Sequence, residues 1–265
     1  GETQTVVIHT LDAFGNHLNT GGNKVSVKLS GKSQQDVSNI KSINTYPIYV
    51  DTDEIVADVV DNGDGTYTAT WTPTKAGDYT VDVTVNGESV KENPFKVTVS
   101  PSDVEPSHCI AEGPGLQRAK CAKDASFKVY LRDRFDNVIT NTAGAVVTGT
   151  VTAEGQEPIN VDVTDNGDGT FSCKYRLRRP GNWTLDVRVN DGAVKDNPFS
   201  LRVTPGAVYV PNTKVDPKDG IAGKPGTRIG LFDVEGNPRH KGGQKVRAAL
   251  ARPLTQEAHA IDNGD

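Results

Sequence analysis

Two identical loops carry the carboxylates whose spacing comes nearest to a metal site. Asp-Asn-Gly-Asp-Gly-Thr occupies residues 61–66 and again residues 165–170. Clustered Asp and Asn oxygens suit Ca²⁺, but an EF-hand loop also needs an acidic residue at its twelfth position. Here the twelfth positions are Thr72 and Arg176. Asn-Gly and Asp-Gly pairs adopt the positive φ of tight strand connections, so the sequence favours a β-turn in both places.

The histidines and cysteines do not combine into a catalytic or metal-binding set. The five His are scattered and expected on the surface, and only His108 adjoins a Cys, Cys109. Neighbouring strand residues point to opposite faces, so this pair cannot easily share a metal. The three Cys match no zinc spacing, and their odd number argues against a disulfide framework. We predict no catalytic residue, no metal and no cofactor, and free thiols, with a Cys109–Cys121 bridge left open.

Two further features have both a functional and a plain explanation. Asn-Trp-Thr at 182–184 is a glycosylation sequon that would matter in a secreted protein, but Trp183 is also expected in a core. A basic cluster is either a functional patch or solvated loop charge; it consists of Arg176, Arg178 and Arg179. The net charge of −5 argues against nucleic-acid binding, which needs a concentrated basic surface.

The strongest pattern is a repeat of about 100 residues. The loop at 61–67 recurs 104 residues later at 165–171, and Asp-Asn-Gly-Asp at 262–265 opens a third copy. An Asp-x-x-x-Asn motif also occurs three times, at 12–16, 133–137 and 233–237. A period of this length is the size of one β-sandwich domain.

Between these markers, apolar and polar residues alternate as they do in half-buried strands. After each loop, one strand face carries Tyr67, Ala69 and Trp71, or their counterparts Phe171, Cys173 and Tyr175. The early strand is expected to point inward with Val6, Ile8 and Thr10, matched by Phe127, Val129 and Leu131. This pattern predicts an all-β fold of two packed antiparallel sheets per repeat.

Several motifs together carry a specific resemblance. They are Gly-Pro-Gly-Leu at 113–116, both Asp-Asn-Gly-Asp-Gly-Thr turns, Pro73 with Gly-Asp-Tyr at 77–79, and Asn-Pro-Phe at 93–95 and 197–199. The chain resembles, over nearly its whole length, the filamin repeat, an immunoglobulin-like domain of actin-crosslinking proteins. The resemblance implies tandem immunoglobulin-like antiparallel β-sandwiches arranged in a rod.

The motifs divide the chain into three repeats. Residues 1–100 form a first repeat without the opening strand and with an insertion at about 30–54; residues 101–204 form a complete repeat; residues 205–265 form the N-terminal half of a third. The polar first linker and the very short second one predict a rod with restricted hinges. Because the sequence contains no Met, we expect a piece of a longer protein.

The resemblance also implies how partners bind. In this family a partner adds a strand to the exposed edge of the third strand, in the groove between the third and fourth strands. The groove residues expected in repeat two are Val147, Gly149 and Val151, facing Ile159, Val161 and Val163. Those expected in repeat one are Val25, Val27 and Leu29, and the third strand of repeat three is expected at Val246, Ala248 and Leu250.

The insertion in repeat one has two interpretations. In repeat one, 49 residues separate Asp12 from Asp61, whereas 32 separate Asp133 from Asp165. Loops longer than about 12–15 residues are often functional. The insertion either docks on the sheet edge of its own or a neighbouring repeat and masks the groove, or it is a tolerated variable loop. The segment expected to dock is Tyr46, Pro47, Ile48, Tyr49 and Val50.

These features predict a structural interaction protein and not an enzyme. The main hypothesis is a cytoplasmic, cytoskeletal scaffold or actin-crosslinking rod that binds other proteins by strand addition. Actin itself would bind through domains outside this chain, and dimerisation through another repeat stays open. No apolar run approaches the roughly 20 residues of a membrane helix. The alternative is an extracellular or membrane-anchored adhesion ectodomain built from filamin-like repeats.

Overall fold

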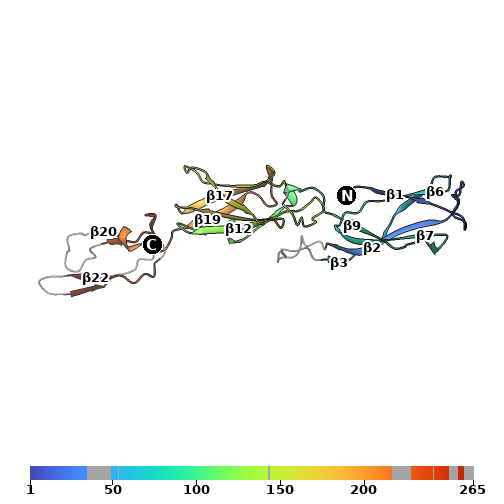
Figure 1. The fold of residues 1–265 in the computed structure, drawn as a ribbon. Coiled ribbons are helices and arrows are strands. Elements are labelled where there is room, and N and C mark those ends of the chain that lie inside the picture. Colours follow the sequence, from blue (N-terminus) through green and yellow to red (C-terminus); the bar gives the residue numbers. More distant parts are fainter. Residues whose placement is uncertain are drawn as a thin grey trace.

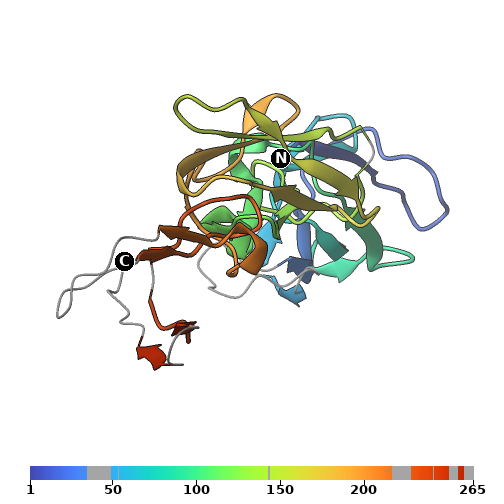
Figure 2. The same cartoon turned by 90° about the vertical axis from the view of Figure 1, so that its left-hand side faces the viewer.

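A computed structural model shows two β-sandwiches and part of a third unit, one after another along the chain (Figure 1). It describes residues 1–34, 49–52, 54–142, 144–216, 228–240, 242–250 and 256–259. Viewed at 90° to this direction, the first two units overlap, and the third projects to one side of them (Figure 2). The predicted all-β class with antiparallel sandwiches is confirmed.

Repeat one packs a three-stranded sheet on a larger one. The first sheet has the order β1 (Gln4–His9), β6 (Thr66–Trp71), β5 (Asp58–Asp61). The second is built on β2 (Val25–Gln34), β7 (Gly77–Val85) and β9 (Phe95–Val99), with short strands β3 (Tyr49–Asp51), β4 (Ile55–Val56) and β8 (Glu88–Ser89). Val27, Leu29 and Ala69 are fully buried between them.

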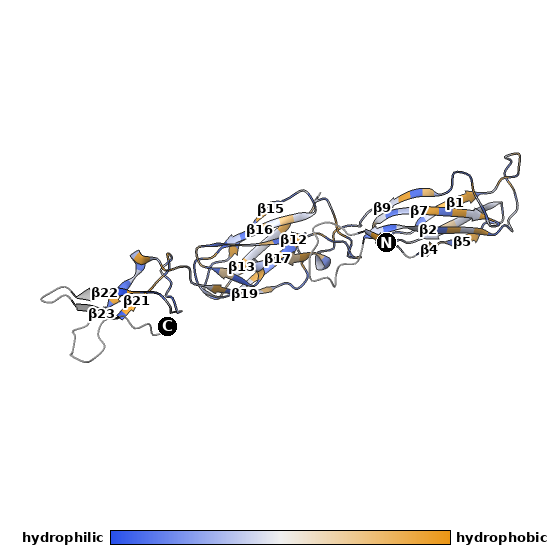
Figure 3. Ribbon diagram, turned by 90° about the horizontal axis from the view of Figure 1, so that it is seen from below, coloured by the Kyte–Doolittle hydropathy of each residue, from blue (hydrophilic) through white to orange (hydrophobic). Residues whose placement is uncertain are grey.

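Repeat two is the more complete sandwich. One sheet has the order β10 (Ile110–Glu112), β12 (Asp124–Tyr130), β16 (Thr170–Arg176), β15 (Asp162–Asp165). The other has the order β11 (Arg118–Lys120), β19 (Phe199–Thr204), β17 (Gly181–Val189), β13 (Val147–Thr152), β14 (Ile159–Asn160), and β18 (Gly192–Ala193) pairs with β17. Two 3₁₀ turns precede β10 and β11, η1 (Pro106–His108) and η2 (Pro114–Leu116). Apolar residues alternate with polar ones along these strands (Figure 3).

The third unit is described only in part. After η3 (Val210–Asn212), β20 (Lys214–Asp216) pairs with β21 (Arg228–Gly230), and β22 (Arg247–Leu250) pairs with β23 (Gln256–His259). The expected third strand of this repeat thus coincides with β22. Across the described ranges, the only helices are short 3₁₀ turns, and none has the length and hydropathy needed to cross a bilayer.

The predicted turns and the Trp183 core anchor are confirmed, whereas Phe95, expected inward, is 41% exposed. Gly63 and Gly65 have φ of 81° and 85°, and the Asp64 carboxylate accepts the Thr66 N–H at 3.0 Å. Trp183 is 5% exposed in the core of repeat two. The three cysteines are free and buried, and burial raises the pKa of the Cys109 thiol to about 11.

Two further expectations are wrong. Val6, expected inward, is 36% exposed, whereas its counterpart Phe127 is 3% exposed. The reason is that β10 covers the outer edge of β12 in repeat two, while among the described residues β1 pairs only with β6. His108 is not a solvated surface residue either, because its Nδ1 lies 2.8 Å from the Asp136 carboxylate in a half-buried contact.

Candidate functional site

The third-strand edge of repeat two is only partly open. On the side opposite β17, β13 meets the two-residue strand β14, where Val151 lies opposite Ile159. The Gly149 carbonyl also accepts the Val161 N–H at 2.9 Å. In the part of the chain that the structure describes, Val147 and Thr148 have no strand partner on that side. The start of β13 is therefore the open part of the edge.

The predicted groove residues of repeat two do not line one open surface. The side chains of Val147, Val151 and Val161 are buried at 7%, 0% and 8% exposure. Val163 belongs to β15 and lies opposite Cys173 in the other sheet. The site therefore offers backbone groups of β13, and Val163 belongs to the facing sheet.

Gly149 has a steric role in this edge. A Cβ at this position would lie 2.9 Å from Val161 Cγ2. The absence of a side chain lets Val161 pack beneath the edge, so β14 lies close against β13.

Repeat one has the same edge with an additional cover. On β2, Leu29 lies opposite Ile55 of β4, and the Val27 carbonyl accepts the Ala57 N–H at 2.9 Å, as at β13 and β14. The insertion then adds β3, which places Val50 opposite Ser33. Val25 has no strand partner on this side among the described residues.

The docking segment predicted in the insertion falls partly within β3. Tyr49 and Val50 pair with the end of β2 in their own repeat, opposite Gln34 and Ser33. They remain 50% and 39% exposed. Tyr46, Pro47 and Ile48 lie outside the described residues. With β4 and β3 together, the outer edge of β2 is covered over most of its length.

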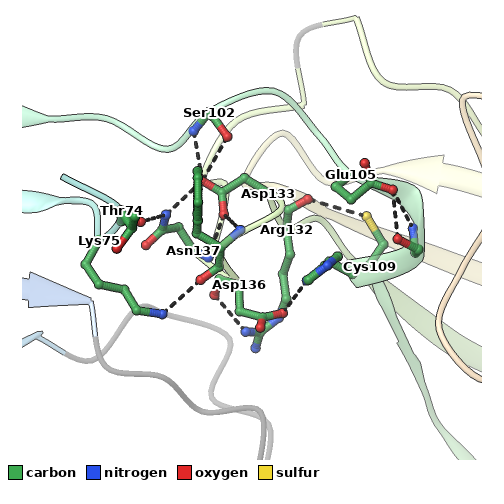
Figure 4. Close-up of polar contacts among 12 residues, drawn as sticks. Thr74, Lys75, Ser102, Glu105, Cys109, Arg132, Asp133, Asp136 and Asn137 are labelled. Atoms are coloured by element: carbon green, nitrogen blue, oxygen red, sulfur yellow. Dashed lines mark hydrogen bonds and ion pairs between the residues drawn. The ribbon is translucent and has the colours of Figure 1, made fainter. Parts of the chain in front are cut away.

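A second polar site holds repeat one against repeat two (Figure 4). The Asn137 side chain reaches the turn between β6 and β7, where its Oδ1 accepts the Ala76 N–H at 2.9 Å and its Nδ2 donates to the Thr74 carbonyl at 2.9 Å. Lys75 Nζ donates to the Phe135 carbonyl at 2.8 Å. The loop of repeat two therefore forms hydrogen bonds with backbone groups of repeat one, and the Lys75 side chain of repeat one bonds the backbone of that loop.

Asp133 fixes the orientation of Asn137. Its carboxylate accepts the Asn137 N–H at 2.9 Å and Nδ2 at 2.8 Å, and also the Ser102 N–H of the linker at 2.9 Å. Asp133 is fully buried. Burial opposes its ionisation, but the hydrogen bonds from Asn137, Ser102 and Phe135 outweigh burial and lower the pKa of Asp133 below its ordinary value.

Gln34 joins this junction to the edge of repeat one. Its Nε2 donates to the Val138 carbonyl at 3.1 Å, and its Oε1 accepts the Val138 N–H at 2.6 Å. Its own N–H donates to the Ala76 carbonyl at 2.7 Å. Because Gln34 also lies opposite Tyr49 of β3, this one residue contacts both β3 and repeat two.

At the second junction, Asp233 and Asn237 take the places of Asp133 and Asn137, and fewer hydrogen bonds are described. Asn237 Nδ2 donates to the Arg178 carbonyl at 2.6 Å, and the Asp233 carboxylate accepts the linker Gly206 N–H at 2.8 Å. Arg178 and Glu235 form a long ion pair of 4.0 Å. The sequence showed the threefold Asp-x-x-x-Asn motif but gave it no role. That recurrence was the available signal for these junction residues.

Comparisons with known proteins agree with this architecture. The Filamin/ABP280 repeat family matches residues 1–96 and 103–200. Filamin-C of Mus musculus is 31% identical over 212 residues, which are 77% of this chain and 7% of that protein. Filamin-A of Drosophila melanogaster is 31% identical over 147 residues, 55% of this chain and 6% of its own. The chain therefore spans a small part of these relatives.

A solved structure supports the fold alone. The Escherichia coli adhesin FdeC has a TM-score of 0.54 at 21% identity, covering 94% of this chain and 73% of that one. Such a likeness carries no function, whereas the family match covers most of both sandwiches. The chain belongs to the filamin repeat family.

Proposed function

We propose that this chain is a rod segment of a cytoskeletal scaffold or actin-crosslinking protein, and that it binds partner proteins by strand addition to its third-strand edges. The observation that carries the proposal is the pairing of two features in each sandwich. A fixed polar junction sets consecutive repeats in line, through Asn137 and Asn237. Within the described ranges, part of the edge of the third strand meanwhile has no strand partner.

Repeat two offers the more accessible edge. An incoming strand can pair first with Val147 and then extend by displacing β14, which contributes only two residue pairs. Each backbone hydrogen bond contributes a net free energy of about 0.5–1.5 kcal/mol. A longer partner strand therefore recovers the free energy that is lost when the β13–β14 hydrogen bonds break. In repeat one the partner must displace β3 as well as β4, so its affinity should be lower.

The role is structural rather than catalytic. Filamin repeats are protein-interaction modules, and the carboxylates here hold backbone: Asp64 its turn, Asp133 and Asp233 the junctions. Among the described residues, no group of three His, Cys, Asp or Glu could hold a metal ion.

A selection experiment tests strand addition. Peptides selected from a random library on the immobilised chain should alternate apolar and polar residues. Because the Gly149 carbonyl faces β14, the Val147 N–H faces the same side, and Val147→Pro removes the first donor that an added strand meets. Selected peptides should bind this variant at least tenfold more weakly under conditions where a thermal melt shows that it is still folded. Peptides that bind both chains equally would refute the proposed site.

The cellular setting is tested separately. The native protein should co-sediment with the actin network of its cells. Asn182 is exposed, so an N-glycan found there on the native protein would overturn the cytoskeletal proposal and favour a cell-surface rod.

A further inference from the structure

The linker between repeats one and two places a hydroxyl group against the buried acid of the junction (Figure 4). The Asp133 carboxylate is fully buried and accepts both the backbone N–H of Ser102, at 2.9 Å, and its Oγ–H, at 3.2 Å. The other donors to this carboxylate, on Phe135 and Asn137, are also neutral. The pKa of Asp133 lies below its ordinary value of 3.8, so the group is ionised at neutral pH. A negative charge on the Ser102 oxygen would therefore lie next to a buried carboxylate.

The second junction makes the same linker contact without a hydroxyl group. There the Gly206 N–H donates to the Asp233 carboxylate at 2.8 Å, so a residue without a side chain forms the backbone bond alone. The hydroxyl of Ser102 is thus an addition to the first junction, and the linker contact of this type does not depend on it. Of these two junctions, the first therefore carries a group that can be modified covalently.

The residues that follow Ser102 are acidic. Asp103 and Glu105 lie one and three positions after it, and no Lys or Arg occurs from residue 97 to residue 117. Ser102 is half-buried and Asp103 is exposed. An enzyme with a basic substrate cleft would recognise this segment by charge, whereas a cleft that selects basic flanking residues would reject it.

We propose that Ser102 is a phosphorylation site for a protein kinase that selects acidic flanking residues, and that its phosphate opens the junction between repeats one and two. In the transfer, Ser102 Oγ attacks the γ-phosphorus of ATP and a new O–P bond forms. The bond between the γ-phosphorus and the β–γ bridging oxygen breaks, ADP leaves with that electron pair, and the hydroxyl proton passes to a base of the kinase. This control of the junction is separate from strand addition at the third-strand edges.

The phosphate acts on the contact with Asp133 in two ways. It replaces the proton that Ser102 Oγ donates to the carboxylate, so one hydrogen bond is lost. It also adds a charge of about −1.5 to −2 at neutral pH. Water screens the two negative groups poorly, because Asp133 is fully buried, and they repel each other. The equilibrium therefore shifts toward a state in which the phosphate has left Asp133 and is solvated.

Moving Ser102 away from Asp133 also moves repeat one. The last strand of that repeat, β9, ends at Val99, only three residues before Ser102. Asp133 in addition orients Asn137, whose Oδ1 accepts the Ala76 N–H of repeat one. Repulsion at Asp133 therefore acts on both the linker and the direct contact between the repeats.

The effect is tested on the full chain with Ser102→phosphoserine introduced by genetic encoding. The Ala76 amide, which donates to Asn137 Oδ1 across the junction at 2.9 Å, should exchange with solvent at least tenfold faster. Residual dipolar couplings of repeats one and two should no longer fit one common alignment. The matched control is Ser107→phosphoserine, because the Ser107 hydroxyl also donates to a carboxylate, that of Glu105 at 2.8 Å, but within repeat two. This control should leave both measurements unchanged.

The modification itself is tested with ATP and a purified Ser/Thr kinase that selects acidic flanking residues. Mass spectrometry should find phosphate on Ser102 of the full chain. The double variant Asp103→Asn, Glu105→Gln should be phosphorylated there at least tenfold more slowly, because it lacks the acidic groups that the kinase recognises. Three results would each overturn the inference: no phosphate on Ser102, an equal rate in the double variant, or a Ser102→phosphoserine chain in which Ala76 exchange is unchanged or slower.

Discussion

Asn137→Ala should release repeat two from repeat one. The substitution removes two hydrogen bonds of 2.9 Å between the repeats and strands the Ala76 N–H, which lies on a residue 2% exposed. Hydrogen bonds contribute about 0.5–1.5 kcal/mol each, and a stranded buried donor costs about 1–3 kcal/mol. The lost Thr74 bond and the stranded Ala76 donor together cost roughly 1.5–4.5 kcal/mol, which raises the open population by about tenfold to 2,000-fold.

The chain contains a matched control for this change. Asn16 makes the same contact within its loop, Nδ2 to the Asp12 carboxylate at 2.9 Å, but no described repeat lies against it. Asn16→Ala therefore measures the loop alone, and the difference between the two variants measures the junction. Residual dipolar couplings in both repeats report their relative orientation. If Asn137→Ala leaves the couplings of the two repeats on one common alignment, as Asn16→Ala should, the junction argument is wrong.

Three further outcomes are expected. Trp183→Ala should destabilise repeat two by about 3–5 kcal/mol in denaturant melts, and a loss below about 1 kcal/mol would contradict its place in the core. Val50→Pro should speed exchange of the Ser33 amide in β2, because Ser33 pairs with Val50, whereas the Gln34 amide is held by the Ala76 carbonyl; unchanged Ser33 exchange would mean that β3 does not cover this edge. Asp133 has a lowered pKa, so its carboxylate stabilises the junction fully above the ordinary value of 3.8, and this contribution is lost as pH falls through the lower folded value. Orientation measured against pH should change only in that acidic range, and not at all in Asp133→Asn.

Alternation predicted which residues face the core, but not which sheet they belong to. Ile159, Val161 and Val163 continue one apolar series, as expected. The chain nevertheless leaves the sheet of β14 after Asn160 and joins the other sheet at Asp162. The inner faces of both sheets border the same core, so a single apolar series is compatible with either sheet. Only the hydrogen-bond partners decide, and these are not local in sequence.

The sequence pattern also did not show which strands are covered by a neighbouring strand. Val6 and Phe127 occupy the same place in the pattern, yet one is 36% and the other 3% exposed. The role of Asn137 was hidden for a related reason: its partners Thr74 and Ala76 belong to the preceding repeat, about 60 positions away. Recurrence marked the loop, but only the stacking of repeats shows what it contacts.

Gln34 sets the two third-strand edges apart. At the first junction, this residue is the last of β2, the strand that carries the edge. Its side-chain amide also forms two hydrogen bonds with the Val138 backbone of repeat two. A partner strand that replaced β3 would therefore pair next to the contacts that hold repeat one against repeat two. At the second junction, Asn237 and Glu235 contact Arg178, in the turn that precedes β17, and Asp233 contacts Gly206 of the linker. Among the described residues, none of these contacts involves β13. Under the proposed function, we therefore expect strand exchange at β13 to leave the repeat axis unchanged, and repeat two to be the better site for a partner that must bind without bending the rod.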